Sequence, residues 1–227
     1  MDYRHELKFQ VSDVELEIIR YRLKPLMQVD IHQEEDSYTV RSLYFDDLYN
    51  SCMRENEDGV DNRRKYRIRI YNGNDTVIKL EKKIKIRGMT RKVSEEISKT
   101  DCLTYMAGRT IELEADASDL EKELYAEMKM SGMHPVSIVE YERTAFVEPK
   151  GNVRITFDRN IGVTEKVEEF LDQNISQIPV LPAGVHVLEV KYDELLPEYI
   201  SQVLETGRLQ RSSFSKYWHS RNYKNFN

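Results

Sequence analysis

Alternation between apolar and charged side chains is the dominant pattern of this sequence, and it is clearest over residues 63–71. Successive side chains of an extended strand point to opposite faces. One face of this stretch is therefore apolar and the other cationic, with Tyr66, Ile68 and Ile70 against Lys65, Arg67 and Arg69. For a single strand, the simplest interpretation is a basic face exposed to solvent. Like charges in a row repel one another, however, unless anions lie against them.

The same alternation recurs along the chain and predicts eight strands. Six of them cover residues 2–11, 38–46, 63–71, 135–147, 153–159 and 185–192. The turns at 72–75 and 87–88 add a strand around residues 78–83 and another over 89–97. In this last strand an arginine interrupts the alternation, so the polar face carries either Arg91 or Lys92.

Helices are predicted between the strands. Ser12 with Glu15, and Ser118 with Glu121, have the spacing of a capping box, and Gly132 follows the second of these helices. The predicted helices cover residues 12–25, 47–56, 99–106, 118–130, 197–206 and 212–223. Helices inserted between antiparallel strands indicate an α+β fold.

The charged strand faces allow two arrangements. In one, the apolar faces pack outward against helices, and eight antiparallel strands close into a barrel with a charged lumen. In the other, an open sheet keeps its charged face in water, and sequence physics alone does not separate the two. The polar faces carry the cations Arg4, Lys8, Lys65, Arg67, Arg69, Lys79, Lys83, Lys92, Arg143, Arg154 and Lys191, and the anions Glu6, Asp46, Glu81, Glu96, Asp158 and Glu189. A lumen with this surplus of cations needs a polyanion to neutralise it.

Composition limits what such a lumen binds. The chain has 227 residues, of which 34 are basic and 40 acidic, with a net charge of −6. An acidic chain is not a general nucleic-acid binder, so any anion site must be local. The two cysteines and the scattered histidines give neither a disulfide framework nor a metal-ligand spacing. Without an apolar signal or membrane-spanning stretch, we expect one cytoplasmic domain over residues 1–227 that does not insert into a membrane.

Eight short motifs follow one another along the chain. They are RHELKF (4–9), SLYFD (42–46), KYRIR (65–69), KLEKK (79–83), YER (141–143), RITFD (154–158), LEVKY (188–192) and SKY (215–217). Over about residues 2–218, this ordered set resembles the VTC domain, the polyphosphate polymerase catalytic domain of the vacuolar transporter chaperone family. That domain belongs to the triphosphate tunnel metalloenzymes, also called CYTH-like proteins.

The resemblance implies an eight-stranded antiparallel tunnel with helices outside and a C-terminal helix at one mouth. It also implies that the terminal phosphate of ATP is transferred to a polyphosphate chain inside the tunnel, with Mn²⁺ or Mg²⁺ as cofactor. The implied phosphate-binding residues are Lys8, Arg67, Arg69, Lys79, Arg91 or Lys92, Arg143, Arg154, Lys191 and Lys216. The implied catalytic residues are Arg67, Arg69, Lys79, Arg143, Arg154 and Glu189.

The resemblance assigns the metal and the tunnel wall as well. Glu189 is the chief metal ligand and Glu6 a second one, whereas Tyr44 and Asp46 support the wall. Some polar-face residues also fit plainer roles. Lys65, Lys83 and Lys191 fit tunnel lining, and Glu81 and Glu96 fit ion pairs with neighbouring cations.

Two departures refine the functional expectation. Tunnel hydrolases carry Glu-x-Glu-x-Lys on the first strand, but here Arg4 precedes Glu6 and Lys8. The missing carboxylate favours a polymerase, with a triphosphate hydrolase and a non-catalytic polyphosphate sensor as alternatives. The chain also lacks the inositol-phosphate-sensing domain and membrane helices of the eukaryotic polymerase. We therefore expect a prokaryotic protein that binds ATP and polyphosphate, not nucleic acid, and that needs a separate membrane partner to export its product.

Overall fold

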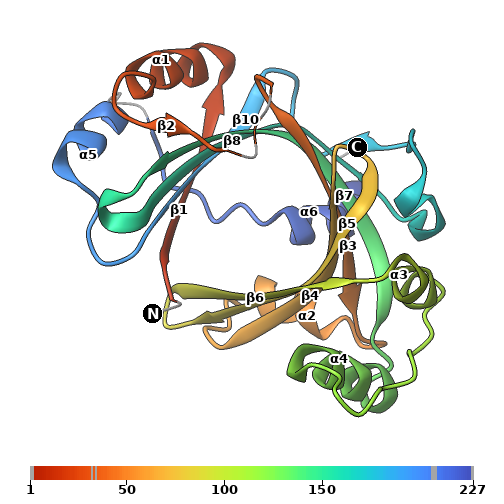
Figure 1. Cartoon of the computed structure of the whole chain (residues 1–227). Coiled ribbons are helices and arrows are strands. Elements are labelled where there is room, and N and C mark those ends of the chain that lie inside the picture. Colours follow the sequence, from red (N-terminus) through yellow and green to blue (C-terminus); the bar gives the residue numbers. More distant parts are fainter. Residues whose placement is uncertain (1–2, 32, 34, 206–208, 226–227) are drawn as a thin grey trace.

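A curled antiparallel sheet dominates the computed structural model, which describes residues 3–31, 33, 35–205 and 209–225. Figure 1 looks through the resulting ring of strands. Each long strand pairs antiparallel with its neighbours, in the order β1 (His5–Ser12), β10 (Val185–Tyr192), β8 (Val153–Thr164), β7 (His134–Glu148), β3 (Tyr38–Asp46), β4 (Arg63–Tyr71), β5 (Asn74–Ile86) and β6 (Met89–Ile97). The two-residue strands β2 (Gln28–Val29) and β9 (Ile178–Pro179) add to β7 and β8.

The two edge strands, β1 and β6, meet at one point. The backbone N–H of Arg4 donates to the carbonyl of Thr90 at 2.8 Å, and the N–H of Thr90 donates back at 2.9 Å. Farther along β1, the N–H of Ser212 donates to the carbonyl of Lys8 at 2.7 Å. The seam of the barrel is thus joined at one end by β6 and lined at the other by the chain that leads to the last helix.

The hydrophobic core lies outside the ring, because the apolar strand faces point outward under the helices. In the described part of the chain these are α1 (Asp13–Leu23), α2 (Ser51–Glu57), α3 (Lys99–Met106), α4 (Asp119–Met130), α5 (Glu198–Leu204) and α6 (Lys216–Asn222). Figure 1 shows α1 and α5 outside one side of the ring and α3 and α4 outside another. One apolar cluster joins Leu188 and Ile155 to Leu16 of α1, and a larger one joins Ile68 to Leu124 of α4.

The fold class is confirmed: the chain is α+β, with an eight-stranded antiparallel tunnel and helices outside it. Helix α6 packs against α2, β7 and β8, and in Figure 1 it lies across the opening of the ring. Short 3₁₀ segments at Lys150–Asn152, Val167–Leu171 and Tyr223–Asn225 complete the elements. None of the described helices combines the length and the apolar character that crossing a bilayer requires.

Both predicted capping boxes are present. The Ser12 hydroxyl accepts from the N–H of Glu15, whose carboxylate accepts from the N–H of Ser12, and Ser118 and Glu121 repeat the arrangement. Gly132 ends α4 with φ at +67°, a conformation that favours glycine. These local signals fixed the starts of two helices that cover the outside of the barrel.

Several predicted boundaries were wrong. Helix α2 begins at Ser51 and not at residue 47, because the Asp47 carboxylate accepts from the N–H groups of Tyr49 and Ser51 and holds a turn there. Strand β8 continues to Thr164 beyond the predicted end at residue 159. Helix α6 begins at Lys216 because residues 211 and 212 pair with β1. The predicted loop 179–184 contains the end of β9, and residues 2 and 206 of two other predictions lie outside the described residues.

Candidate active site

The barrel encloses a cavity of about 910 Å³. All eight long strands contribute side chains to its lining, together with residues 211–217 of the segment that leads into α6. Lysine and arginine dominate the lining, whereas Glu6 and Glu189 are its only carboxylates among the described residues. The charged strand faces therefore turn inward, as the barrel arrangement predicted.

Nearly all residues proposed from the sequence line this cavity. These are Lys8, Arg67, Arg69, Arg91, Lys92, Arg143, Arg154, Lys191, Lys216, Glu6 and Glu189. The sequence left open whether Arg91 or Lys92 faces the cavity. Both residues line it, although only Lys92 follows the inward alternation of β6. Lys79 is the exception, because it is not among the described residues that line the cavity. In the strand register Lys79 of β5 lies opposite Arg69 of β4, and its side chain is half-buried.

Glu81 anchors the cations of β4 and β6 from beneath. Its side chain is fully buried, and its carboxylate accepts from Arg67 Nε and Lys92 Nζ, both at 2.8 Å. Arg69 lies 3.7 Å away and donates to the Ser42 hydroxyl at 3.1 Å. Burial alone raises the pKa of Glu81, but these cations outweigh burial and hold the pKa well below its usual range. Glu81 is thus a permanent anion that fixes the two guanidinium groups.

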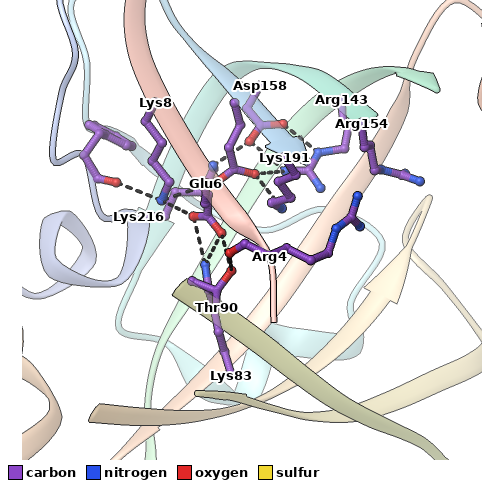
Figure 2. Close-up of polar contacts among 12 residues, drawn as sticks. Arg4, Glu6, Lys8, Lys83, Thr90, Arg143, Arg154, Asp158, Lys191 and Lys216 are labelled. Atoms are coloured by element: carbon purple, nitrogen blue, oxygen red, sulfur yellow. Dashed lines mark hydrogen bonds and ion pairs between the residues drawn. The ribbon is translucent and has the colours of Figure 1, made fainter. Parts of the chain in front are cut away.

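Glu6 and Glu189 share Lys8, as Figure 2 shows for Glu6. The Lys8 ammonium lies 3.1 Å from Glu6 and 3.3 Å from Glu189 and donates to the carbonyl of Phe214 at 3.0 Å. Lys83 pairs with Glu6, and Lys191 with Glu189, each at 2.8 Å. Burial raises the pKa of both carboxylates, but the lysines outweigh it, so the two pKa values lie below the usual range.

Asp158 holds a third group of cations under the cavity wall. Asp158 is fully buried and accepts two hydrogen bonds from Arg143, at 2.7 and 2.8 Å. It also forms an ion pair with Lys216 at 2.5 Å. Lys216 also lies 4.7 Å from the centre of the Tyr141 ring. Burial opposes ionisation, but Arg143 and Lys216 prevail and keep the pKa of Asp158 below its usual value. The last helix is thereby tied to β7 and β8 through the cavity.

Arg4, next to β1, and Arg154 of β8 also line the cavity, and Figure 2 shows both reaching into the same space. Arg154 forms an ion pair with buried Asp30 and donates to the Tyr38 hydroxyl at 3.2 Å. Arg4 pairs with Asp193 at 3.2 Å. The Arg4 side chain therefore adds a further cation to the cavity lining.

Tyr44 and Asp46 lie in the wall, as expected. The Tyr44 hydroxyl accepts from Arg67 at 3.2 Å. The fully buried Asp46 accepts from the N–H groups of Cys52 and Met53 and from the Tyr217 hydroxyl. Asp46 therefore joins β3 to the start of α2 and to α6, and it holds the Tyr217 ring against the cavity.

A divalent cation fits this lining only together with a phosphate ligand. Within the described residues, no group of three or more Asp, Glu, His or Cys side chains forms a metal cage. The carboxylates of Glu6 and Glu189 lie close together, because both form an ion pair with Lys8. Mg²⁺ typically binds through one or two carboxylates and substrate phosphates and keeps several waters. The pair suits such an ion, which would compete with the lysines for the carboxylates.

A comparison with protein families identifies the family of this chain. The VTC domain profile matches residues 3–224. The chain belongs to the VTC domain family. Among curated proteins, no sequence matches it significantly.

Solved structures share the fold of this VTC domain at low sequence identity. A proposed adenylyl cyclase from Hippeastrum, with a dominant triphosphatase activity, has a TM-score of 0.56 and 14% identity, over 98% of this chain and 96% of that one. A proposed adenylate cyclase from Vibrio parahaemolyticus has a TM-score of 0.53 and 12% identity, over 96% and 97% of the two chains. The PH1819 protein of Pyrococcus horikoshii reaches 0.50 and 15%, over 98% and 99%. These likenesses show that the chain shares its fold, a curled antiparallel sheet with helices outside it, with these proteins.

The cavity of the VTC domain also contains residues that the sequence reading left out. Arg63 and Lys85 continue the inward alternation of β4 and β5 by one more step, so the period of two was sufficient to find them. Arg211 precedes the last helix in an irregular segment, where no periodicity marks its direction. Tyr38 also lines the cavity and follows the inward alternation of β3.

Proposed function

We propose that this VTC domain transfers the terminal phosphate of ATP to a polyphosphate chain inside the cavity, with Mg²⁺ or Mn²⁺ as cofactor. One observation carries the proposal: cations from many strands converge on one cavity. Among the described residues, only two carboxylates line that cavity, and the whole chain has a net charge of −6. Such a space attracts a flexible polyanion, and the family match supports phosphate as its chemistry.

The proposed chemistry is positioning and charge neutralisation. Arg67, Arg69, Arg143 and Arg154 would bind phosphate oxygens, because a guanidinium group offers paired donors that match them. Their carboxylate partners hold the guanidinium groups in place before the substrate arrives, so little reorganisation is needed. Phosphoryl transfer to a phosphate oxygen needs no covalent intermediate with the protein.

The remaining proposed contacts complete the substrate site. Lys8, Lys191 and Lys216 would bind phosphate oxygens, and Arg91 and Lys92 would do so from β6. A divalent ion held by Glu189 and Glu6 would polarise the transferred phosphoryl group. Lys79 is left out of the proposed set, because it does not share the cavity with the others.

Hydrolysis of the triphosphate is the second candidate. The Hippeastrum protein, which has a dominant triphosphatase activity, shares this fold. If water attacked the terminal phosphate in place of a polyphosphate end, the cavity would hydrolyse the triphosphate. Arg4 favours transfer over hydrolysis, because it stands where the tunnel hydrolases carry a further carboxylate. A non-catalytic polyphosphate sensor would use the same cations without turnover. A cytoplasmic location and a separate membrane partner for product export remain predictions.

Incubation with ATP and Mn²⁺ or Mg²⁺ tests the proposal on a polyphosphate gel. We expect a ladder of growing chains, whereas release of orthophosphate alone would identify a hydrolase, and binding without turnover a sensor. Glu189→Gln should retain tripolyphosphate binding and lose turnover, since it removes a carboxylate but leaves its cation partners free for phosphate. Glu112→Gln, at an exposed position, is the matched control. Unchanged turnover in Glu189→Gln would contradict the proposed metal ligand.

A further inference from the structure

Helix α1 is apolar on two opposite faces. The face that packs on the barrel carries the buried residues Leu16, Ile19 and Leu23. The opposite face carries Val14, Ile18 and Tyr21, whose exposed fractions are 68%, 42% and 80%. A helix at the surface of a globular protein normally turns charged or polar residues toward solvent. We refer to Val14, Ile18 and Tyr21 as the α1 ridge.

Exposed apolar surface is concentrated in this part of the chain. Among the described residues, six of the sixteen large apolar side chains that are exposed lie within residues 14–31. Three of them form the α1 ridge, and the others, Leu26, Val29 and Ile31, follow the helix in the chain. Helix α4 also covers the barrel, but its exposed positions include charged residues such as Lys122 and Lys129. A concentration of exposed apolar side chains is typical of a surface that contacts another molecule.

The charged residues of α1 indicate which molecule fits the ridge. The acidic residues before the helix midpoint are Asp13, Glu15 and Glu17, and the basic residues after it are Arg20, Arg22 and Lys24. Each acidic residue stands as far before the midpoint as one basic residue stands after it. The helix dipole also favours this order, but it gives no reason for an exposed apolar ridge among the charges. A second copy of α1, running in the opposite direction, would place its basic half against the acidic half of the first.

Helical geometry brings the charges into line with the ridge. With about 3.6 residues per turn, Asp13 and Lys24 lie along the same side of the ridge, near its two ends. A two-fold axis across an antiparallel helix pair brings each side of one ridge against the same side of the other. Ile18 then lies near the axis, Val14 meets Tyr21 of the second copy, and Asp13 faces Lys24 of the second copy.

These charges are accessible in the single chain. Asp13 contacts His186 at 2.7 Å, yet its side chain is 73% exposed. Glu17 lies 3.6 Å from Arg20, and its side chain is also mostly exposed. Lys24, at the C-cap of α1, is exposed as well. In Figure 1, α1 lies at the outside of the molecule, so its outer face is open to a second copy.

We propose that the α1 ridge is the contact face of a symmetric dimer, in which α1 packs antiparallel against α1 of a second copy of this chain. The inference does not rest on the proposed function, because the three ridge residues lie outside the barrel and do not line the cavity. One helix from each chain makes a small interface, so we expect a weak dimer with a dissociation constant of roughly 10–100 µM.

Sedimentation velocity of the full chain, between about 1 and 300 µM, tests the dimer. We expect the unmodified protein to shift from monomer to dimer as its concentration rises. Ile18→Lys places two like charges near the two-fold axis and should raise the dissociation constant at least about tenfold. Met130→Lys, at an exposed residue of α4, is the matched control and should leave the dissociation constant unchanged. Both positions are exposed, so both variants should keep the unfolding temperature of the unmodified protein.

Disulfide cross-linking tests the orientation of the two helices. Ile18→Cys should cross-link with itself. Val14→Cys should not, because its two copies lie roughly 12 Å apart along the helix axes, beyond the reach of a disulfide. A mixture of Val14→Cys and Tyr21→Cys should form a cross-linked heterodimer. The native residues Cys52 and Cys102 are buried and should contribute no background.

Three results would overturn the inference and leave the proposed function standing. They are a monomer at every concentration, a dimer that Ile18→Lys leaves intact, and cross-linking of Val14→Cys with itself. Binding of the monomer to phosphatidylcholine vesicles, with no dimer in solution, would assign the ridge to a lipid surface and would overturn it too. A dimer that forms no polyphosphate from ATP would contradict the proposed function alone.

Discussion

Glu81 has no exposed surface, yet it lies beneath three cations of the cavity. A buried carboxylate is costly unless its partners are complete. Arg67, Arg69 and Lys92 supply those partners, and the carboxylate in turn directs Arg67 toward the cavity. The residues proposed to bind phosphate are therefore also part of what stabilises the fold.

This double role changes what a charge-removal experiment measures. Arg67→Ala with Arg69→Ala should reduce tripolyphosphate affinity at least about 100-fold, because two charged hydrogen bonds of about 1.5–3 kcal/mol each are lost. Among the described residues, the same variant leaves Glu81 with one cation, Lys92, and the Ser94 hydroxyl, so the free energy of unfolding should fall by about 3 kcal/mol. Titration calorimetry and urea unfolding measure the two effects.

A third substitution separates binding from folding in this experiment. Adding Glu81→Gln removes the buried charge and should recover part of the lost stability without recovering affinity. If the triple variant binds tripolyphosphate like the unmodified protein, Arg67 and Arg69 are not phosphate ligands.

Lys65 makes affinity dependent on pH. With a pKa of about 7 in the free protein, Lys65 loses its charge as pH rises above 7, and a bound polyanion favours the charged form. Binding above pH 7 therefore takes up a proton, so long-chain affinity should fall by at most about tenfold per pH unit through this group. Below pH 7 Lys65 is already charged, and this contribution levels off. The groups around it are Arg63, Lys83, Lys8, Cys52, Glu55, Asn56 and Tyr217.

Calorimetry between pH 6.5 and 9, in buffers of different ionisation enthalpy, measures both affinity and proton uptake. Lys65→Met should show a flatter pH profile and less proton uptake than the unmodified protein, while the titration of polyphosphate itself affects both equally. Identical profiles for the two proteins would show that Lys65 does not contact the chain.

At the scale of elements, alternation predicted which face of each long strand turns inward, and the structure confirms it for the eight long strands. Alternation failed where the backbone departs from a regular strand. In β8 the pairing with β7 shifts register between Glu140 and Glu142, and Asn160 has φ at +51°. This bulge moves an extra residue into the strand and disrupts the period of two. The predicted end at residue 159 coincides with the bulge, and the strand continues beyond it.

Periodicity also gives a face but no position along the tunnel. Lys79 alternates with Glu81 on β5, yet it is not among the described residues that line the cavity. The pairing of each cation with a buried carboxylate could not be read from the sequence either. Glu81 meets Arg67 across neighbouring strands, but Lys216 reaches Asp158 from a helix more than fifty residues away in the chain. Only the closed barrel brings such residues together.

Residue Asp46 shows how elements are joined around the cavity. It ends β3, accepts from the N–H groups of Cys52 and Met53 in the first turn of α2, and accepts from the Tyr217 hydroxyl of α6. The motif containing Asp46 indicated a wall residue, and the structure adds that the wall and the last helix share one carboxylate. Because Tyr217 also lies beside Lys65, the position of α6 contributes to the surroundings of that lysine.

At the scale of the whole molecule, charge is divided between inside and outside. The chain has more acidic than basic residues, 40 against 34, yet its cavity lining is dominated by cations. The hydrophobic clusters lie between the ring and its outer helices. The free fold therefore carries unbalanced positive charge at its centre, where a globular protein usually has an apolar core. A ligand that neutralises this charge should stabilise the entire barrel.

Thermal unfolding tests this consequence. Long-chain polyphosphate at about 100 times its dissociation constant adds about 2.7 kcal/mol to the free energy of unfolding, because it binds only the folded barrel. For a chain of this size, each kcal/mol shifts the unfolding temperature by about 2–4 °C, so we expect a rise of roughly 5–10 °C. Sodium chloride at matched ionic strength should give a much smaller rise, since chloride screens the cations without bridging them. An equal rise in chloride would mean that general screening, and not a chain bound along the tunnel, stabilises the barrel.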